Sequence, residues 1–168
     1  MLTPVPLALD ELVDKINHIK FNLIDKVNYM SVNQQLFTVL DAYKSALQTT
    51  LAQQLPQLSL LNFRVLRLIG GTREVTPLQV AQLLRRDKAQ VTRLLAELVD
   101  KGWLRKQPHP QDKRSVQLLL TEQGQVLLQQ ALVLEQQLSQ RMLLGMSATQ
   151  QQQLGDGLTA LLANLQQA

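Results

Sequence analysis

The stretch TPLQVAQLLRRDKAQVTRLLAELVDKG, residues 76–102, decides the fold. Thr76 begins it, followed by proline and, three residues on, by Gln79, an order typical of a helix start. Asp87 caps a second helix, whose apolar residues recur at three- and four-residue steps until Gly102, the residue type expected just past a helix end. Two short helices joined by a few residues, the second amphipathic, predict a helix-turn-helix.

The residues on either side complete a compact module. Residues 103–106 and 116–120 are each typical of a short strand, and 108–113 are typical of a turn, so a β-hairpin with a basic tip is expected. Upstream, Ser59 starts a further helix that ends at a pair of glycines. We therefore expect one compact module over residues 58–120.

Long helices flank this module. An extra N-terminal helix is expected within residues 1–30, a second helix over 31–57, and two more over 121–168. At about 20 residues each they are roughly 30 Å long, longer than such a module is wide. The chain alone cannot cover all their apolar stripes, which favours a homodimer held by the helices of 31–57 and 121–168. The alternative is a monomeric bundle.

Composition excludes several classes of protein. The 168 residues include 37 Leu and 25 Gln but only 6 aromatic residues, which favours helices over strands. Cysteine is absent and the two histidines, His18 and His109, are far apart, so neither a metal site nor a cofactor is expected. No apolar run is long enough to span a membrane, so a cytoplasmic protein is expected. No nucleophile with a base, paired carboxylates or phosphate-binding loop indicates an enzyme.

The positive charge is concentrated. The net charge is +4, but residues 85–114 alone carry nine basic and four acidic residues, a local excess of +5, and the rest of the chain is −1. A solvated face would mix the signs more evenly, so this segment favours a polyanion as partner.

The second helix of the pair has two distinct halves on its exposed side. Lys88, Gln90, Thr92 and Arg93 lie in its first two turns, whereas its acidic residues lie further on, where they would repel phosphate. The N-terminal half is therefore expected to enter a DNA groove. There Gln90 suits adenine, the methyl group of Thr92 suits thymine, and Arg93 suits guanine or a phosphate.

Each of these assignments has an alternative. Gln90 could serve only as a helix cap, and Arg93 could serve only to pair with Glu97 one turn on. Arg85 and Arg86, in the turn, are expected to contact phosphate on charge alone. At the hairpin tip, two basic side chains, Lys113 and Arg114, follow Asp112. Asp112 is expected to orient one of them while the other reaches the minor groove of DNA.

The chain resembles the MarR (multiple antibiotic resistance regulator) family of winged helix-turn-helix transcription regulators from about Gln34 to Gln166. The resemblance is carried by LSLLNFRVLRLIGG at 58–71, by residues 76–104, and most specifically by HPQDKRSVQLLLTEQG at 109–124. The family's wing reads Asp-Pro-x-Asp-x-Arg, then a strand and Leu-Thr-x-x-Gly. Here His109 replaces the first Asp and the other positions fit.

The resemblance implies a mostly α, winged helix-turn-helix fold and an obligate homodimer on a pseudo-palindromic operator, which we expect to act as a repressor. It also implies release by a small anionic or phenolic effector, for which Tyr43, Arg64 and Arg67 are the candidate ligands. A competing function is a winged-helix adaptor or antirepressor that binds proteins and does not read DNA.

Overall fold

The structure is a computed structural model that describes residues 31–108 and 115–167. They fall into two compact units, 31–45 and 46–167, each described here by itself. The expected N-terminal helix of residues 1–30 and the expected hairpin tip lie outside the described residues. The elements are α2 (Val32–Gln54), which spans the boundary between the units, α3 (Leu60–Gly71), α4 (Pro77–Leu84), α5 (Lys88–Asp100), β1 (Leu104–Pro108), β2 (Val116–Leu120), α6 (Glu122–Met142) and α7 (Ala148–Gln166).

Side-chain caps start the helices at the residues that the sequence predicts. The hydroxyl of Ser59 accepts a hydrogen bond from the backbone N–H of Asn62 at 3.1 Å and begins α3. Thr76 and Ser147 each form a full capping box with the glutamine three residues on, and thereby begin α4 and α7. Each cap satisfies backbone N–H groups that have no partner inside the helix.

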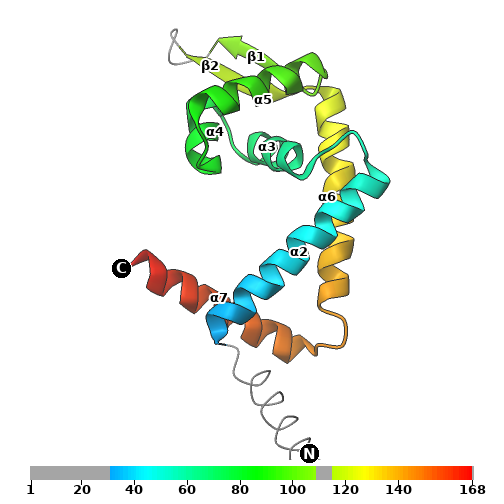
Figure 1. Cartoon of the computed structure of the whole chain (residues 1–168), viewed down its shortest axis with the longest axis vertical. Helices are drawn as coiled ribbons and strands as arrows, with labels where there is room; N and C mark the ends of the chain where they lie inside the picture. Colours follow the sequence, from blue (N-terminus) through cyan, green and yellow to red (C-terminus); the bar gives the residue numbers. More distant parts are fainter. Residues whose placement is uncertain (1–30, 109–114, 168) are drawn as a thin grey trace, which may run out of the picture. The chain divides into compact units, whose positions relative to one another are not determined.

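The hydrophobic core lies in the second unit. Phe63, Val65 and Leu66 of α3 are almost completely inaccessible, as are Leu95 and Leu98 of α5. In Figure 1, α3, α4 and α5 gather beside the two strands. Helix α3 contacts α6 and β2, and α4 contacts α5. The apolar stripe predicted for α5 is therefore buried against its own chain, which leaves the opposite face of α5 exposed.

The wing is an antiparallel pair in which Leu104 lies opposite Leu120 and Pro108 opposite Val116. The first strand thus runs two residues beyond the predicted 103–106, because Pro108 occupies the last position of an edge strand, where a missing N–H costs no ladder hydrogen bond. Leu118 of β2 also donates its N–H to the carbonyl of Val75, at 2.7 Å. This bond fixes the wing to the segment between α3 and α4.

The start of α6 is joined closely to the residues between α5 and β1. The hydroxyl of Thr121 donates to the carbonyl of Gly102 at 2.6 Å, and its N–H donates to the carbonyl of Trp103 at 3.1 Å. A Cβ atom at Gly124 would lie 2.0 Å from the carbonyl oxygen of Trp103, so only glycine permits this approach.

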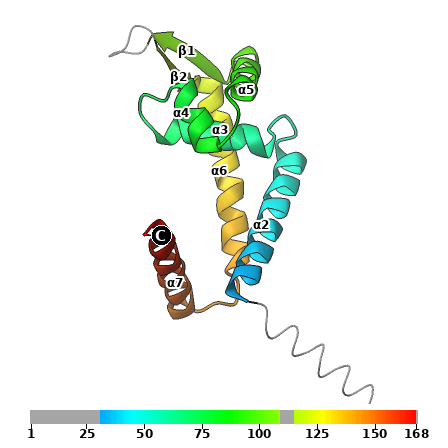
Figure 2. The same cartoon turned by 60° about the vertical axis from the view of Figure 1, so that its left-hand side comes forward.

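The last helix, α7, differs from the helices of the core. None of its described residues is buried, and its leucines are exposed along one stripe. Figure 2 shows α7 as a separate helix of the second unit that follows α6 in the chain. The exposed leucines are Leu154, Leu158, Leu161, Leu162 and Leu165. Among the described helices, none is long and apolar enough to cross a membrane.

Candidate nucleic-acid interface

The turn between α4 and α5 carries two adjacent arginines. Arg85 ends α4 in the left-handed conformation, with φ +50° and ψ +48°, and its N–H donates to the carbonyls of Ala81 and Gln82. Glycine or asparagine usually occupies such a position, because a longer side chain costs about 1 kcal/mol there. Arg85 and Arg86 are both exposed. The turn therefore presents two guanidinium groups at a site where its backbone alone would favour glycine.

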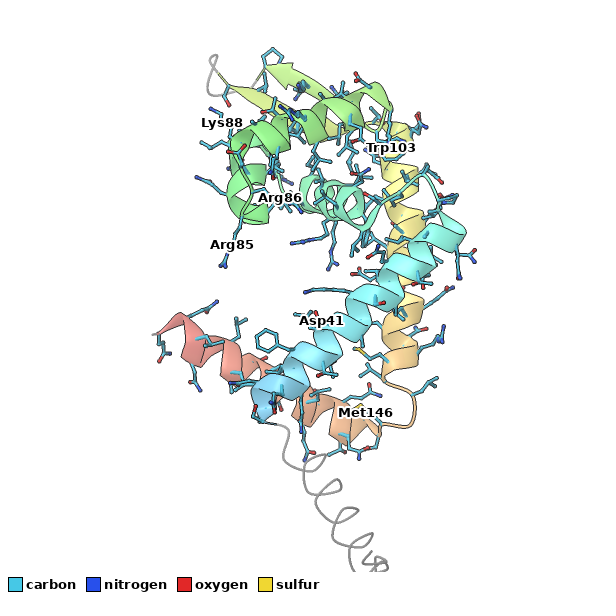
Figure 3. The ribbon with its side chains drawn as sticks, viewed as in Figure 1. Asp41, Arg85, Arg86, Lys88, Trp103 and Met146 are labelled. Atoms are coloured by element: carbon cyan, nitrogen blue, oxygen red, sulfur yellow. The ribbon has the colours of Figure 1, made fainter. Side chains whose placement is uncertain are left out.

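Asp87 caps the N-terminal end of α5. Its Oδ1 atom accepts hydrogen bonds from the N–H groups of Ala89, at 2.8 Å, and Gln90, at 3.3 Å. A carboxylate at this end of a helix also interacts favourably with the helix dipole. In Figure 3, Arg85, Arg86 and Lys88 lie where α4 and α5 meet, and Trp103 lies beyond the other end of α5.

The first two turns of α5 expose the residues that the sequence singles out. Lys88, Gln90, Thr92 and Arg93 are all exposed, whereas Val91 between them is buried. The hydroxyl of Thr92 donates to the carbonyl of Lys88 at 2.8 Å. The hydroxyl has thus used its donor, and Thr92 offers an outside partner its methyl group and an accepting oxygen. All six described candidates are exposed, and we refer to them together as the α4–α5 surface: Arg85, Arg86, Lys88, Gln90, Thr92 and Arg93.

Glu97 pairs with Lys101, and not with Arg93, which is the alternative that the sequence left open. Its carboxylate accepts a hydrogen bond from Lys101 at 2.6 Å. This hydrogen bond and the positive charge of Lys101 lower the pKa of Glu97 below its ordinary value of 4.5, and the Asn62 side chain adds to the effect. No role is predicted for Lys101 from the sequence, although its spacing from Glu97 indicates this pair. The signal was present, since glutamate four residues before lysine is the favoured order on a helix and arginine before glutamate is the weaker one.

Lys101 also contacts the only tryptophan of the chain. Its Nζ atom lies 4.9 Å from the centre of the Trp103 ring, a cation–π contact, and Trp103 itself is buried. Glu97, Lys101 and Trp103 therefore fix the C-terminal end of α5. The N-terminal end keeps its positive side chains for other partners.

Two of the three effector candidates, Arg64 and Arg67, lie one turn apart on α3, and they have different surroundings. Arg67 forms an ion pair with Glu135 of α6, with 2.5 Å between Nη1 and Oε1. Arg64 lines an open groove of about 710 Å³, which also contacts Arg86 and Lys101. Tyr43 belongs to the unit of residues 31–45, and its position relative to this groove is not described. Arg64 therefore lies beside Arg86 of the α4–α5 surface, whereas Arg67 is paired with α6.

The remaining candidates lie outside the described residues: Asp112, Lys113 and Arg114. The strands that flank them are described, and two further basic residues, Arg105 and Lys106, are exposed on β1. Arg105 donates to the side chain of Gln107 at 3.0 Å. The described part of the wing thus adds positive charge that the sequence analysis counted but did not assign to the site.

Comparisons with known proteins agree with this geometry. The sequence profile of the MarR family matches residues 58–116. The chain is 36% identical to the multiple antibiotic resistance protein MarR of Escherichia coli K12 over 99 residues, which cover 59% of this chain and 62% of that protein. It is 34% identical to the MarR protein of Salmonella typhimurium over 107 residues, 64% of this chain and 67% of the relative. The chain thus spans less than two thirds of the E. coli protein.

A solved structure of a mutant E. coli MarR complexed with operator DNA is similar in fold. It has a TM-score of 0.66 and 27% sequence identity, and the match covers 80% of this chain and 96% of that one. The helices, the turn and the two strands described above are therefore those of a winged helix. Taken together, the profile, the sequence relatives and the fold show that this chain belongs to the MarR family.

Proposed function

We propose that this protein is a transcriptional regulator that binds double-stranded DNA as a homodimer, one α5 helix to each half of a pseudo-palindromic operator. The observation that carries the proposal is the α4–α5 surface, on which Arg85, Arg86, Lys88 and Arg93 are all exposed. Four cations on one surface attract the phosphates of a duplex. The role is one of binding, without catalysis.

The distribution of charge along α5 supports an approach by its first two turns. Lys88 and Arg93 are exposed at the N-terminal end, and the acidic Asp100 is exposed at the other end. The positive charge of Lys101 is engaged with Glu97 and Trp103. A helix with this polarity enters the major groove with its N-terminal half, as in other helix-turn-helix proteins.

The tip of the wing is proposed to give the second contact. By sequence, Lys113 and Arg114 follow Asp112 directly, which suits an arginine held toward the narrow, strongly negative minor groove. The exposed Arg105 and Lys106 on β1 support a phosphate-facing wing.

The homodimer is proposed to form through the long helices of residues 31–57 and 121–168. Support comes from α7, whose leucine stripe has no buried member in the described structure. In the first unit, Phe37 and Val39 of α2 are likewise exposed. A second copy of the chain would remove these side chains from water, at about 25 cal/mol for each Å² of apolar area.

Action as a cytoplasmic repressor is proposed from the relatives. One solved relative, a mutant of E. coli MarR, is complexed with operator DNA, and the sequence relatives carry the name multiple antibiotic resistance protein. A repressor needs no more than occupancy of an operator by the dimer, which the α4–α5 surface supports.

Release by a small anionic or phenolic effector is a further part of the proposal. The groove beside Arg64 supports it, since Arg64 and Arg86 line the groove and Leu94 gives it an apolar wall. Glu97 also lines the groove, and its charge is paired with Lys101. A bound anion would occupy Arg86 and so compete with a DNA phosphate. With 2-hydroxybenzoate as the probe, operator affinity should fall as the probe is added, and Arg64→Ala should weaken that response without changing affinity in its absence.

The decisive experiment measures DNA binding against salt. Purified protein is titrated with duplexes selected from a randomised library, at several salt concentrations. If several phosphates are neutralised, the affinity should fall by orders of magnitude between about 50 and 200 mM salt. A protein that binds no duplex at moderate salt, but captures another protein through the same surface, would instead be the adaptor or antirepressor.

A further inference from the structure

Four of the described helices have a glutamine as their third residue. In three of them its side chain bonds to the capping residue, and in the fourth it does not. The glutamines are Gln34, Gln79, Gln90 and Gln150. In α2, α4 and α7 the glutamine side chain bonds back to the N–H of the capping residue. The distances are 3.0 Å from Ser31 to Gln34, 2.8 Å from Thr76 to Gln79, and 2.8 Å from Ser147 to Gln150.

Gln90 of α5 is the exception. Its backbone N–H donates to the carboxylate of Asp87, but within the described structure its side-chain amide makes no hydrogen bond to Asp87 or to any other residue. Gln90 is also exposed. Its amide therefore keeps both a donor and an acceptor for a partner outside the chain.

The identity of the capping residue explains the difference. A hydroxyl cap attracts the glutamine oxygen, because it can donate as well as accept: the hydroxyl of Thr76 lies 3.2 Å from Oε1 of Gln79 and donates to it. An ionised carboxylate only accepts hydrogen bonds and repels a carbonyl oxygen. Asp87 also accepts from two backbone N–H groups by itself, so α5 is capped without help from its glutamine.

We propose that Asp87 is a positioning residue that keeps the Gln90 amide out of a capping box, so that Gln90 reads an adenine in the major groove of each operator half-site. The proposal rests on the proposed function, since it needs the first turns of α5 to enter the groove. A glutamine amide matches adenine in a bidentate pair: its N–H donates to N7 and its oxygen accepts from the N6 amino group. Thr92 is two residues on, with its hydroxyl engaged and its methyl group free to contact a thymine.

The test converts the cap of α5 into the type found in the other three helices. Asp87→Ser creates the sequence Ser-x-x-Gln of α2 and α7, and should return the Gln90 amide to the cap while α5 stays capped. Asp87→Asn removes the same negative charge and supplies an amide N–H donor, so it should act in the same direction as Asp87→Ser. Binding is measured by fluorescence anisotropy on the duplex selected by the full-length protein and on duplexes in which each half-site base is changed in turn.

The parent protein should prefer adenine at one half-site position by roughly 5- to 150-fold, the range expected for one bidentate pair. Gln90→Ala and Asp87→Ser should both reduce that preference to a few-fold at the same position. Asp87→Asn should lower it as well, and all variants should retain binding to non-specific duplex. In a Gln90→Ala background, Asp87→Ser should cause no further loss of preference, because Asp87 acts through Gln90.

Three results would overturn the proposal. If Gln90→Ala keeps the adenine preference, Gln90 is not the reading residue. If Asp87→Ser keeps the preference, or Asp87→Asn keeps it, Asp87 does not position Gln90 in this way. Failure of the proposed function looks different, because the parent protein itself would then select no duplex. Circular dichroism of each variant separates a loss of preference from a loss of fold.

Discussion

The helices α5 and α7 are both capped and amphipathic, but the rest of the chain buries the apolar side of α5 and leaves that of α7 exposed. In α5 the apolar residues Val91, Leu95 and Leu98 are buried by the module, and the exposed side is polar. In α7 the leucines are themselves exposed. The same kind of sequence pattern thus yields a helix that is complete within its own chain and one that needs another surface to cover it. The first is suited to a polar partner such as DNA, and the second to a second copy of the chain.

Removal of α7 should have the largest effect. A chain that ends at Ser147 should become monomeric, because the removed leucines are the proposed dimer contact. It should still fold, since α7 contributes no buried residue among those described. Affinity for a full operator should fall by about 10²- to 10⁴-fold, because the second half-site no longer binds as a linked site. Sedimentation and anisotropy measure the two effects.

A single substitution tests the same point within the whole chain. Leu158→Glu places a charge in the leucine stripe and should dissociate the dimer, whereas Gln153→Glu adds the same charge at an exposed polar position and should not. A truncated protein that still sediments as a dimer would mean that α7 is not the dimer contact and that its leucines are not covered by a second copy of the chain.

Arg93→Ala tests the exposed face of α5. Loss of one base or phosphate contact should weaken specific binding by about 1–3 kcal/mol and relax the preference at one base position. Stability should change little, because Glu97 pairs with Lys101 and does not depend on Arg93. Lys44→Ala, which removes an exposed cation from the other unit, is the matched control and should leave the affinity for the duplex almost unchanged.

Arg114→Ala tests the predicted wing contact and should have a smaller effect. Removal of one minor-groove or phosphate contact should cost about 1 kcal/mol of binding free energy and lower the dependence of affinity on salt. The sedimentation coefficient should not change. Binding as tight as that of the parent protein, at every salt concentration, would remove Arg114 from the interface.

The effect of acid should be the smallest, and it should follow from the pair of Glu97 with Lys101. Because Lys101 lowers the pKa of Glu97 in the folded state, the pair stabilises the fold above about pH 4.5, and this stability is lost as the pH falls through the lowered pKa. Both side chains are more than a third exposed, at 51% and 38%, so the effect is modest. Glu97→Gln should flatten this part of the curve of urea midpoint against pH.

The sequence predicts much of this fold because most of its signals are local. The caps Ser59, Thr76, Asp87 and Ser147 act over three residues, and each helix begins where its cap predicts. The stripe of α5 is local as well, and its buried and exposed faces follow from helical spacing alone.

Other features depend on contacts that local patterns do not contain. The ion pair of Arg67 with Glu135 joins residues 68 positions apart, so no local pattern distinguishes Arg67 from Arg64 as an effector ligand. The left-handed conformation of Arg85 is set by the tight connection of α4 to α5, and its residue type predicts the opposite. Gln90 shares its position with three capping glutamines, and its difference emerges only from the hydrogen bonds of Asp87.

The contact between Gly124 and Trp103 has a consequence for how the molecule can transmit movement. The first turn of α6 is bound to the backbone just past α5 by two hydrogen bonds and by an approach too close for any side chain. Because no side chain separates the two segments, a displacement of α6 is expected to move the residues that follow α5. If α5 reads DNA as proposed, a larger residue at position 124 should push these segments apart and alter the spacing of the two α5 helices of the dimer, while the proposed DNA contacts themselves are unchanged.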